Sequence, residues 1–398
     1  MNRKFIFHVV DMPYTISDGS MTVNPFSEKM IRFCKFMKNR GHKIFHYGHE
    51  DSKIDCDVSV NIFDRNDWER FWPNKKWEDK SNGFIDYNNL YADEYMYKKA
   101  SDAIKEYKNK NDIFVNFIGN SQRIISDENP DIITVEANVA YSITCCYSKW
   151  KVYESYSALH ALTGEKCLEV DQDGDGYHNW YHAVIPGFFD KLKYEYSENK
   201  QDYFLYLGRV IRLKGVTYAI EATRATGKKL IIAGPGDIVQ DPQFPYKTIP
   251  DHVMCIGAVG HDERSELIKN AKCCFMMTTT AEAFGNVMFE SFLHGTPIIS
   301  TDWGSFSENN LHGITGYRAR TLDHMIWAIK NIDKIKPINC RKWGETFSLE
   351  NAAIRYEEYF NMIMDYYEKD GWATINQDRE NLDWLNYQCP FNLDFSTP

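Results

Sequence analysis

The chain has 398 residues, enough for two or three domains, and its 43% apolar and 26% charged residues are ordinary for a globular protein. A formal net charge of −10 argues against nucleic acid as a partner, because no basic stripe offsets it. No apolar stretch is long enough to span a membrane, and the chain opens on a strand-like run at 4–10 instead of a leader. We therefore expect a cytoplasmic protein without a membrane span.

The ten cysteines do not have the spacing of a disulfide framework. Cys145-Cys146 and Cys273-Cys274 are adjacent pairs inside apolar runs, and no Cys-x-x-Cys occurs. We expect reduced thiols in the protein core, which agrees with a cytoplasmic location.

Strand-like and helix-like segments alternate through the first half of the chain. A strand at 4–10, a helix at 26–40 and a strand at 42–47 form a predicted βαβ unit. The remaining predicted segments of this half are an insertion with short helices at 61–95, a helix at 94–109, and strands at 112–117 and 131–135.

The pattern restarts near residue 186 and predicts a second βα series. Its strands are expected at 203–207, 229–233, 253–256, 273–279 and 297–301, and its helices at 215–226, 263–271 and 286–294. The fold class is therefore α/β, with two doubly wound, Rossmann-like domains facing an interdomain cleft. We place the domains at 1–186 and 187–365, and we expect the tail, 366–398, to pack back on the first domain.

Two cations follow the first strand of the second half. Arg209 lies at the strand end and Lys214 at the next helix start, where a phosphate docks in such folds. The next strand ends in Gly234-Pro235-Gly236, whose small residues allow a flat base to approach the backbone.

Two carboxylates, Glu282 and Glu290, flank a strand-to-helix junction broken by Gly285. The free N–H groups of Asn286 and Val287 at the predicted helix start form an anion site. A phosphate held between two carboxylates that bind hydroxyls describes a nucleotide-sugar.

The order of these motifs resembles the retaining family-four glycosyltransferases of the B-type fold. The resemblance covers about 203–359 and includes Gly295-Thr296-Pro297, Glu308 and Gly316-Tyr317-Arg318. It implies transfer of a hexose from a nucleoside-diphosphate sugar, with GDP or UDP as the carrier, to a hydroxyl acceptor such as a glycan. It also implies no metal and no further cofactor. The sequence does not encode the base, sugar, acceptor or oligomeric state.

The resemblance also implies roles for single residues. Arg209 and Lys214 hold the donor diphosphate, Glu282 contacts the sugar hydroxyls, and Glu290 accepts from the ribose hydroxyls. The backbone that meets sugar and phosphate, and the lining of the base pocket, are formed by Phe284, Gly285, Asn286, Val287, Gly234, Gly236 and Val259.

The first half matches the family less sharply. Gly19, in the loop after the first strand, is the candidate for close approach to phosphate or acceptor, although many members have two glycines there. Glu136 stands where many members have a histidine. As a site residue it would bind sugar or acceptor hydroxyls, or steady positive charge at the anomeric carbon. The alternative is a carboxylate at the strand end that caps the following turn. We expect His160 to pack in the core.

Three other functions are weighed against this one. Nucleotide-sugar 2-epimerases share the fold, and a non-catalytic sugar-nucleotide binder would keep the same pocket. A dehydrogenase is disfavoured because Gly234-Pro235-Gly236 lacks the third glycine of a dinucleotide fingerprint. The segment 171–176 begins like a calcium loop but has His182 at position twelve, so we expect an acidic surface loop.

Overall fold

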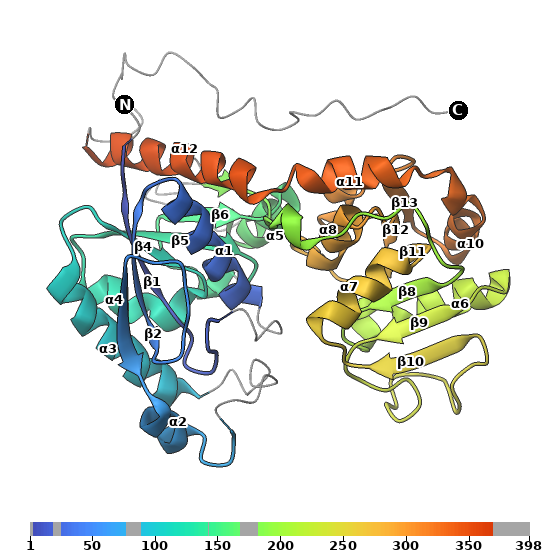
Figure 1. Ribbon diagram of the computed structural model, residues 1–398, viewed down its shortest axis with the longest axis horizontal. Helices are drawn as coiled ribbons and strands as arrows, with labels where there is room; N and C mark the ends of the chain where they lie inside the picture. Colours follow the sequence, from blue (N-terminus) through green and yellow to red (C-terminus); the bar gives the residue numbers. More distant parts are fainter. Residues whose placement is uncertain (1–2, 19–24, 77–88, 142, 168–181, 369–398) are drawn as a thin grey trace. The chain divides into compact units, whose positions relative to one another are not determined.

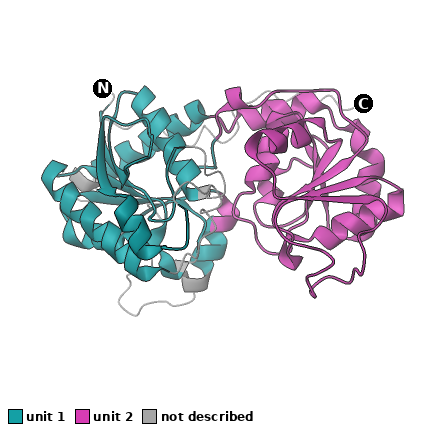
Figure 2. Ribbon diagram, turned by 60° about the horizontal axis from the view of Figure 1, so that its bottom comes forward, with its two compact units in different colours: residues 1–154, 159–188, 349–384 teal, residues 155–158, 189–348, 385–398 magenta. Residues whose placement is uncertain are grey.

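The computed structural model describes residues 3–18, 25–76, 89–141, 143–167 and 182–368, which form two compact units (Figure 1). Among these residues, unit 1 comprises 3–154, 159–188 and 349–368, and unit 2 comprises 155–158 and 189–348 (Figure 2). Each unit is built on one sheet whose strands are all parallel, and helices pack on the sheet, so the predicted α/β class is confirmed.

Unit 1 contains a seven-stranded sheet in the order β3-β2-β1-β4-β5-β6-β7. Its strands are β1 Ile6–Val10, β2 Lys43–His49, β3 Val58–Phe63, β4 Ile113–Asn116, β5 Ile133–Val139, β6 Trp150–Tyr153 and β7 Ala183–Val184. The strand order reverses between β1 and β4, which makes this the switch point of a doubly wound sheet.

Alternating side chains pack the two faces of this sheet against different helices. On one face, Phe7 and Val9 pack with α1 (Pro25–Asn39) and α12 (Leu349–Glu368). On the other, Phe45 and Tyr47 pack with α3 (Leu90–Tyr107). The strands are apolar on both sides because helices cover both faces. The remaining helices of unit 1 are α2 Arg65–Phe71, α4 Arg123–Glu128 and most of α5 Tyr156–Cys167.

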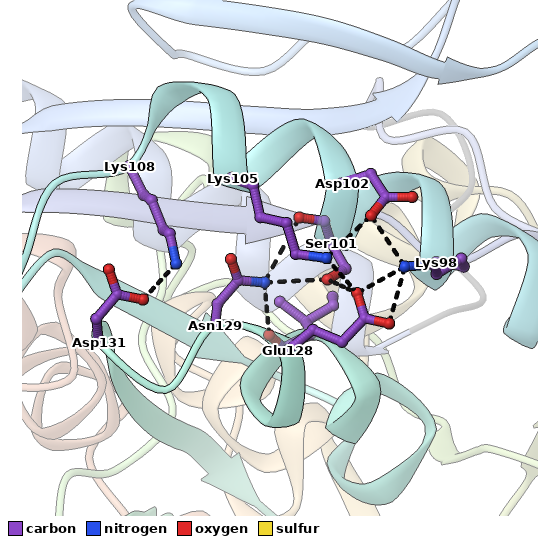
Figure 3. A network of polar contacts seen from close by, with 9 residues as sticks. Lys98, Ser101, Asp102, Lys105, Lys108, Glu128, Asn129 and Asp131 are labelled. Carbon is purple, nitrogen blue, oxygen red and sulfur yellow. Dashed lines mark hydrogen bonds and ion pairs between the residues drawn. The ribbon is translucent and has the colours of Figure 1, made fainter.

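A polar network fastens α3 to the end of α4 (Figure 3). The carboxylate of Glu128 accepts hydrogen bonds from Lys98, Lys105 and Ser101 at 2.6–2.8 Å, and the two lysines hold the pKa of Glu128 down at about 2. The lysines are half-exposed, so their ion pairs contribute little stability. Asn129 is fully buried and donates to Ser101 Oγ and to the carbonyl of Ile125, which makes it the stronger tie.

Unit 2 contains a six-stranded sheet in the order β10-β9-β8-β11-β12-β13. Its strands are β8 Phe204–Leu207, β9 Leu230–Ala233, β10 Val253–Gly257, β11 Cys273–Met276, β12 Ile298–Thr301 and β13 Gly316–Ala319. Its helices are α6 Val216–Thr226, α7 His261–Asn270, α8 Asn286–Leu293, α9 Phe306–Asn309, α10 Leu322–Asn331 and α11 Pro337–Glu345. The order reverses between β8 and β11, so the loops after these two strands meet at the switch point.

Helix α12 belongs to unit 1, although we placed residues 349–365 in the second domain. The physical reason is its apolar face: Tyr356 packs against Phe33 and Phe36 of α1, and Phe360 packs against Phe7 of β1. The chain therefore returns to unit 1 before the predicted tail begins. Of that tail, residues 369–398 lie outside the described residues.

Two smaller expectations need correction. Cys34, Cys273, Cys274 and Cys340 are buried free thiols, but Cys145 and Cys255 are exposed, so the thiols are not confined to the core. His160 is exposed on α5 instead of packed in the core. No helix in the described part of the chain is both long enough and apolar enough to cross a bilayer.

Candidate active site

The loops after β8 and β9 in unit 2 lie in direct backbone contact. Gly208 N–H donates to Ala233 O at 2.9 Å, and Val210 N–H donates to Pro235 O at 2.8 Å. A side chain at Gly234 would overlap the carbonyl of Gly208, and one at Gly236 would lie 2.6 Å from Val210 O. These glycines are therefore required by the contact between the loops. Their predicted role of admitting the donor base stays a prediction.

The loop that carries Lys214 is also locked to the loop after β11. Thr279 N–H donates to Leu213 O at 2.8 Å. Gly215 has φ of 70°, and a Cβ there would overlap the carbonyl oxygen of Met277. Only glycine fits this combination of left-handed backbone and close approach. The turn between β8 and α6 is consequently held in one position relative to the loop that carries Glu282.

This lock brings two predicted site residues into contact. The Lys214 ammonium donates to Glu282 Oε2, and Thr278 Oγ1 donates to the same oxygen at 3.4 Å. The two side chains are 30% and 23% exposed, so a ligand can reach them. Arg209 is exposed, and within the described residues its guanidinium makes no hydrogen bond or ion pair. Lys214 is thus already paired with a carboxylate. The guanidinium of Arg209, the other residue predicted to bind phosphate, is open to a ligand.

The start of α8 presents its backbone at the same edge of the sheet. Gly285 precedes the helix with φ of 89°, and Asn286 and Val287 are its first two residues, whose N–H groups have no acceptor within the helix. The Phe284 ring is buried and stacks on Phe289 at 4.4 Å. Its carbonyl accepts from Ser305 Oγ and Asn309 Nδ2 at 3.0 Å each. Phe284 can therefore offer a ligand little besides backbone.

The second carboxylate of the motif has a partner that the sequence analysis did not identify. Glu290 Oε2 accepts from Arg264 of α7, and the two side chains are 13% and 30% exposed. Val259, in the turn before α7, is half-buried and packs against the core of unit 2. Arg264 was missed because a helical arginine gives no local signal of which carboxylate it will meet.

In unit 1, Glu136 lies on β5 with its carboxylate fully buried. It accepts from the N–H groups of Tyr147 and Ser148 at 3.1–3.3 Å, and Lys151 Nζ lies 3.9 Å away. Burial raises the pKa of Glu136 to about 7, although Lys151 and these N–H groups act in the opposite direction. The contacts are those of a carboxylate that holds the following turn. A role next to the transferred sugar stays a prediction.

A second buried cluster follows β1. Asp11 Oδ1 lies 3.0 Å from His46 Nε2, and Asp11 Oδ2 accepts from Ser52 Oγ at 2.6 Å and from His49 N–H at 3.2 Å. Burial raises the pKa of Asp11, but His46 and His49 outweigh it, so the pKa lies below its ordinary value. The cluster fixes the start of the loop in which we placed Gly19. Gly19 itself lies outside the described residues, as does the 171–176 loop.

Comparison with known proteins gives a family match within the second unit. Residues 201–333 match the family model for glycosyl transferases group 1. An uncharacterized glycosyltransferase of Methanocaldococcus jannaschii is 27% identical over 251 residues, 58% of this chain and 60% of the relative. The 2-deoxystreptamine N-acetyl-D-glucosaminyltransferase of Niallia circulans is 25% identical over 172 residues, 42% and 43% of the two chains. These matches span 60% or less of each relative.

Solved structures extend the likeness to both units. A glycosyltransferase involved in avilamycin A biosynthesis has a TM-score of 0.63 at 17% identity, covering 91% of this chain and 98% of its own. Anabaena HepE, in complex with UDP and glucose, has a TM-score of 0.62 at 14% identity, covering 90% and 99%. The chain therefore has the B-type glycosyltransferase fold, and the match to the family model lies in its second unit.

The contact between the loops after β8 and β11 in unit 2 can be tested at the two ends of α6. Gly215→Ala should reduce turnover at least tenfold and lower the free energy of unfolding by more than about 2 kcal/mol, because the new Cβ meets the Met277 carbonyl. Gly227 ends the same helix with φ of 65° and has nothing within 4 Å of an added Cβ. Gly227→Ala should cost only about 1 kcal/mol and keep activity. Equal effects in urea denaturation would refute the lock.

Glu136 predicts a pH dependence of stability. Its pKa rises from 4.5 to about 7 on folding, so the folded state binds the proton more tightly between these pH values. The quantity to measure is the difference in the free energy of unfolding between wild type and Glu136→Gln. This difference should change by up to about 3 kcal/mol against wild type as the pH rises from 4.5 to 7.5. Comparing the two proteins cancels other titrations. A difference that does not vary with pH would contradict the buried, neutral carboxyl.

Proposed function

We propose that the protein is a retaining hexosyltransferase that moves a sugar from a GDP- or UDP-linked donor to a hydroxyl acceptor such as a glycan. The observation that carries the proposal is the contact between Lys214 and Glu282 at the switch point of the unit 2 sheet. Arg209 lies in the same loop as Lys214, and α8 begins shortly after Glu282. Cations, a helix N-terminus and a carboxylate at one sheet edge suit a ligand that is anionic in one part and rich in hydroxyls in another.

In this proposal Arg209 and Lys214 bind the diphosphate of the donor. Arg209 is exposed, and among the described residues its guanidinium makes no hydrogen bond or ion pair, so it can bind phosphate in a bidentate manner. Lys214 must exchange Glu282 for phosphate. An exposed ion pair of this kind is worth about 0–1 kcal/mol, whereas a charge-assisted hydrogen bond to a diphosphate contributes about 1.5–3 kcal/mol. The exchange is therefore favourable.

The two carboxylates then divide the hydroxyl groups of the donor. Glu282 accepts from the sugar, and Glu290, the fifth residue of α8, accepts from the ribose about one helical turn into the helix. The N–H groups of Asn286 and Val287 meet the phosphate between them. Gly234, Gly236 and Val259 line the base pocket through their backbone, which is why the choice of base has no side-chain signature in this chain.

Retention follows, in this proposal, from a front-face reaction. The leaving diphosphate, held by Arg209 and Lys214, takes the proton of the acceptor hydroxyl and guides its attack on the face from which it departs. Glu136 orients substrate or steadies positive charge at the anomeric carbon, and Gly19 approaches phosphate or acceptor. The two cations stabilise the departing charge, so no metal or other cofactor is proposed. A cytoplasmic location also remains part of the proposal.

A single assay tests the reaction. The purified protein is titrated calorimetrically with UDP-, GDP- and ADP-sugars, and the donor that binds is incubated with glycan acceptors in the presence of EDTA. The expected result is transfer that survives the chelator, with the donor's anomeric configuration kept in the product by NMR. Loss of transfer on chelation would reject the metal-free route, and an inverted linkage would reject retention. Release of an epimerised free sugar would favour the 2-epimerase alternative.

The diphosphate clamp gives the matching mutational prediction. Arg209→Ala and Lys214→Ala should each lower kcat/KM at least tenfold, because each removes a charge-assisted hydrogen bond worth about 1.5–3 kcal/mol. Arg212 lies in the same turn, is exposed and has no assigned contact with the donor, so Arg212→Ala should change kcat/KM less than about threefold. Wild-type kcat/KM in both clamp variants would remove this assignment.

A further inference from the structure

Two side-chain contacts, one residue apart on α7, connect this helix to the end of α8. Arg264 donates to Glu290 Oε2, and Ser265 Oγ lies 2.9 Å from His294 Nε2. His294 is fully buried, and its Nδ1 lies 2.7 Å from the carbonyl of Glu195. The Ser265 contact therefore belongs to a buried structural anchor, whereas the Arg264 contact is partly open to solvent.

The Arg264 contact leaves hydrogen-bonding capacity unused on both partners. Within the described residues, Arg264 Nε is buried and has no hydrogen-bond acceptor, and Glu290 Oε1 makes no hydrogen bond. A buried donor without a partner is unusual in a folded protein and calls for an explanation, such as a bound water or a functional role. A pair of adjacent hydroxyl groups supplies both the acceptor and the donor that these atoms lack.

We propose that Arg264 is a positioning residue for the recognition of ribose, which rests on the role proposed above for Glu290. The guanidinium holds Oε2 of the carboxylate and thereby fixes the direction of Oε1, which accepts from a ribose hydroxyl. A glutamate side chain without this partner would have to be ordered when the nucleotide binds, and affinity would be lost. Arg264 is planar and can keep two hydrogen bonds in fixed directions, which lysine cannot.

Arg264 should therefore determine how strongly the protein distinguishes ribose from deoxyribose. A purely structural tie between α7 and α8 would change overall stability or affinity, but not this preference. The measurement uses the one of UDP, GDP and ADP that binds wild type most tightly, together with its 2′-deoxy and 3′-deoxy forms. The quantity compared is the ratio of Kd values for the deoxy and ribo forms.

Wild type should bind the ribo form at least about tenfold more tightly than one of the deoxy forms, as expected for a lost hydrogen bond to a charged group. Glu290→Gln and Arg264→Gln should both reduce this ratio to about threefold or less, and Arg264→Lys should lie between Arg264→Gln and wild type. Ser265→Ala, which cuts the neighbouring contact between the same helices, should keep the wild-type ratio.

The outcomes separate this inference from the proposed function. A wild-type ratio in Arg264→Gln, with the ratio lost in Glu290→Gln, would overturn the role of Arg264 and leave the proposed function intact. A reduced ratio in Ser265→Ala would show that any loosening of α7 is enough, which would also overturn it. If Arg264→Gln does not fold, a wild-type ratio in Arg264→Lys is the overturning result. A wild type that binds none of the three nucleotides would overturn the proposed function and this inference together.

Discussion

The carbonyl oxygen of Met277 occupies the space that a side chain at position 215 would need, and the geometry of the candidate site depends on that contact. It holds the turn between β8 and α6 against the loop after β11, and Thr279 N–H adds a hydrogen bond to Leu213 O. Both loops leave neighbouring parallel strands, so these contacts hold the two loops together at one edge of the sheet. Lys214 and Glu282 are 68 residues apart in sequence, yet backbone contacts alone bring them together.

The central strands could be predicted from the sequence because their residues are uniformly apolar. Phe204–Leu207 and Cys273–Met276 are buried at every position, which only a sheet covered on both faces allows. Two strands at one end of the unit 1 sheet, β6 and the edge strand β7, could not be predicted in the same way. Strand β7 has two residues, and β6 contains Lys151, whose polar head is buried beside Glu136 and hides the apolar pattern. Helix α12 has an apolar face, but its own sequence does not indicate that this face packs against α1.

The same distinction holds within the site. Residue types at strand ends and helix starts can be predicted because turns and helix termini have local signatures, and on this basis the cations, carboxylates and α8 start were placed. The pairing of charges has no such signature. Arg264 meets Glu290, and Asp11 meets His46, because separate strands and helices converge, so neither pair is visible in the spacing of residues. Gly234 shows a related limit of sequence-based prediction. A side chain at this position would overlap the carbonyl of Gly208, so the fold alone requires glycine there and no ligand is needed to explain it.

The charge pairs also give the two phosphate ligands unequal parts in the proposed reaction. Arg209 and the α8 N-terminus, which acts as roughly half a positive charge, are unpaired among the described residues, so a diphosphate meets them first. Lys214 exchanges Glu282 for phosphate, and the exchange is more favourable when Glu282 finds other hydrogen-bond donors. The hydroxyl groups of the sugar are such donors, and a bare nucleoside diphosphate does not supply them. The stabilisation of the leaving group is therefore strongest when the sugar to be transferred is in place.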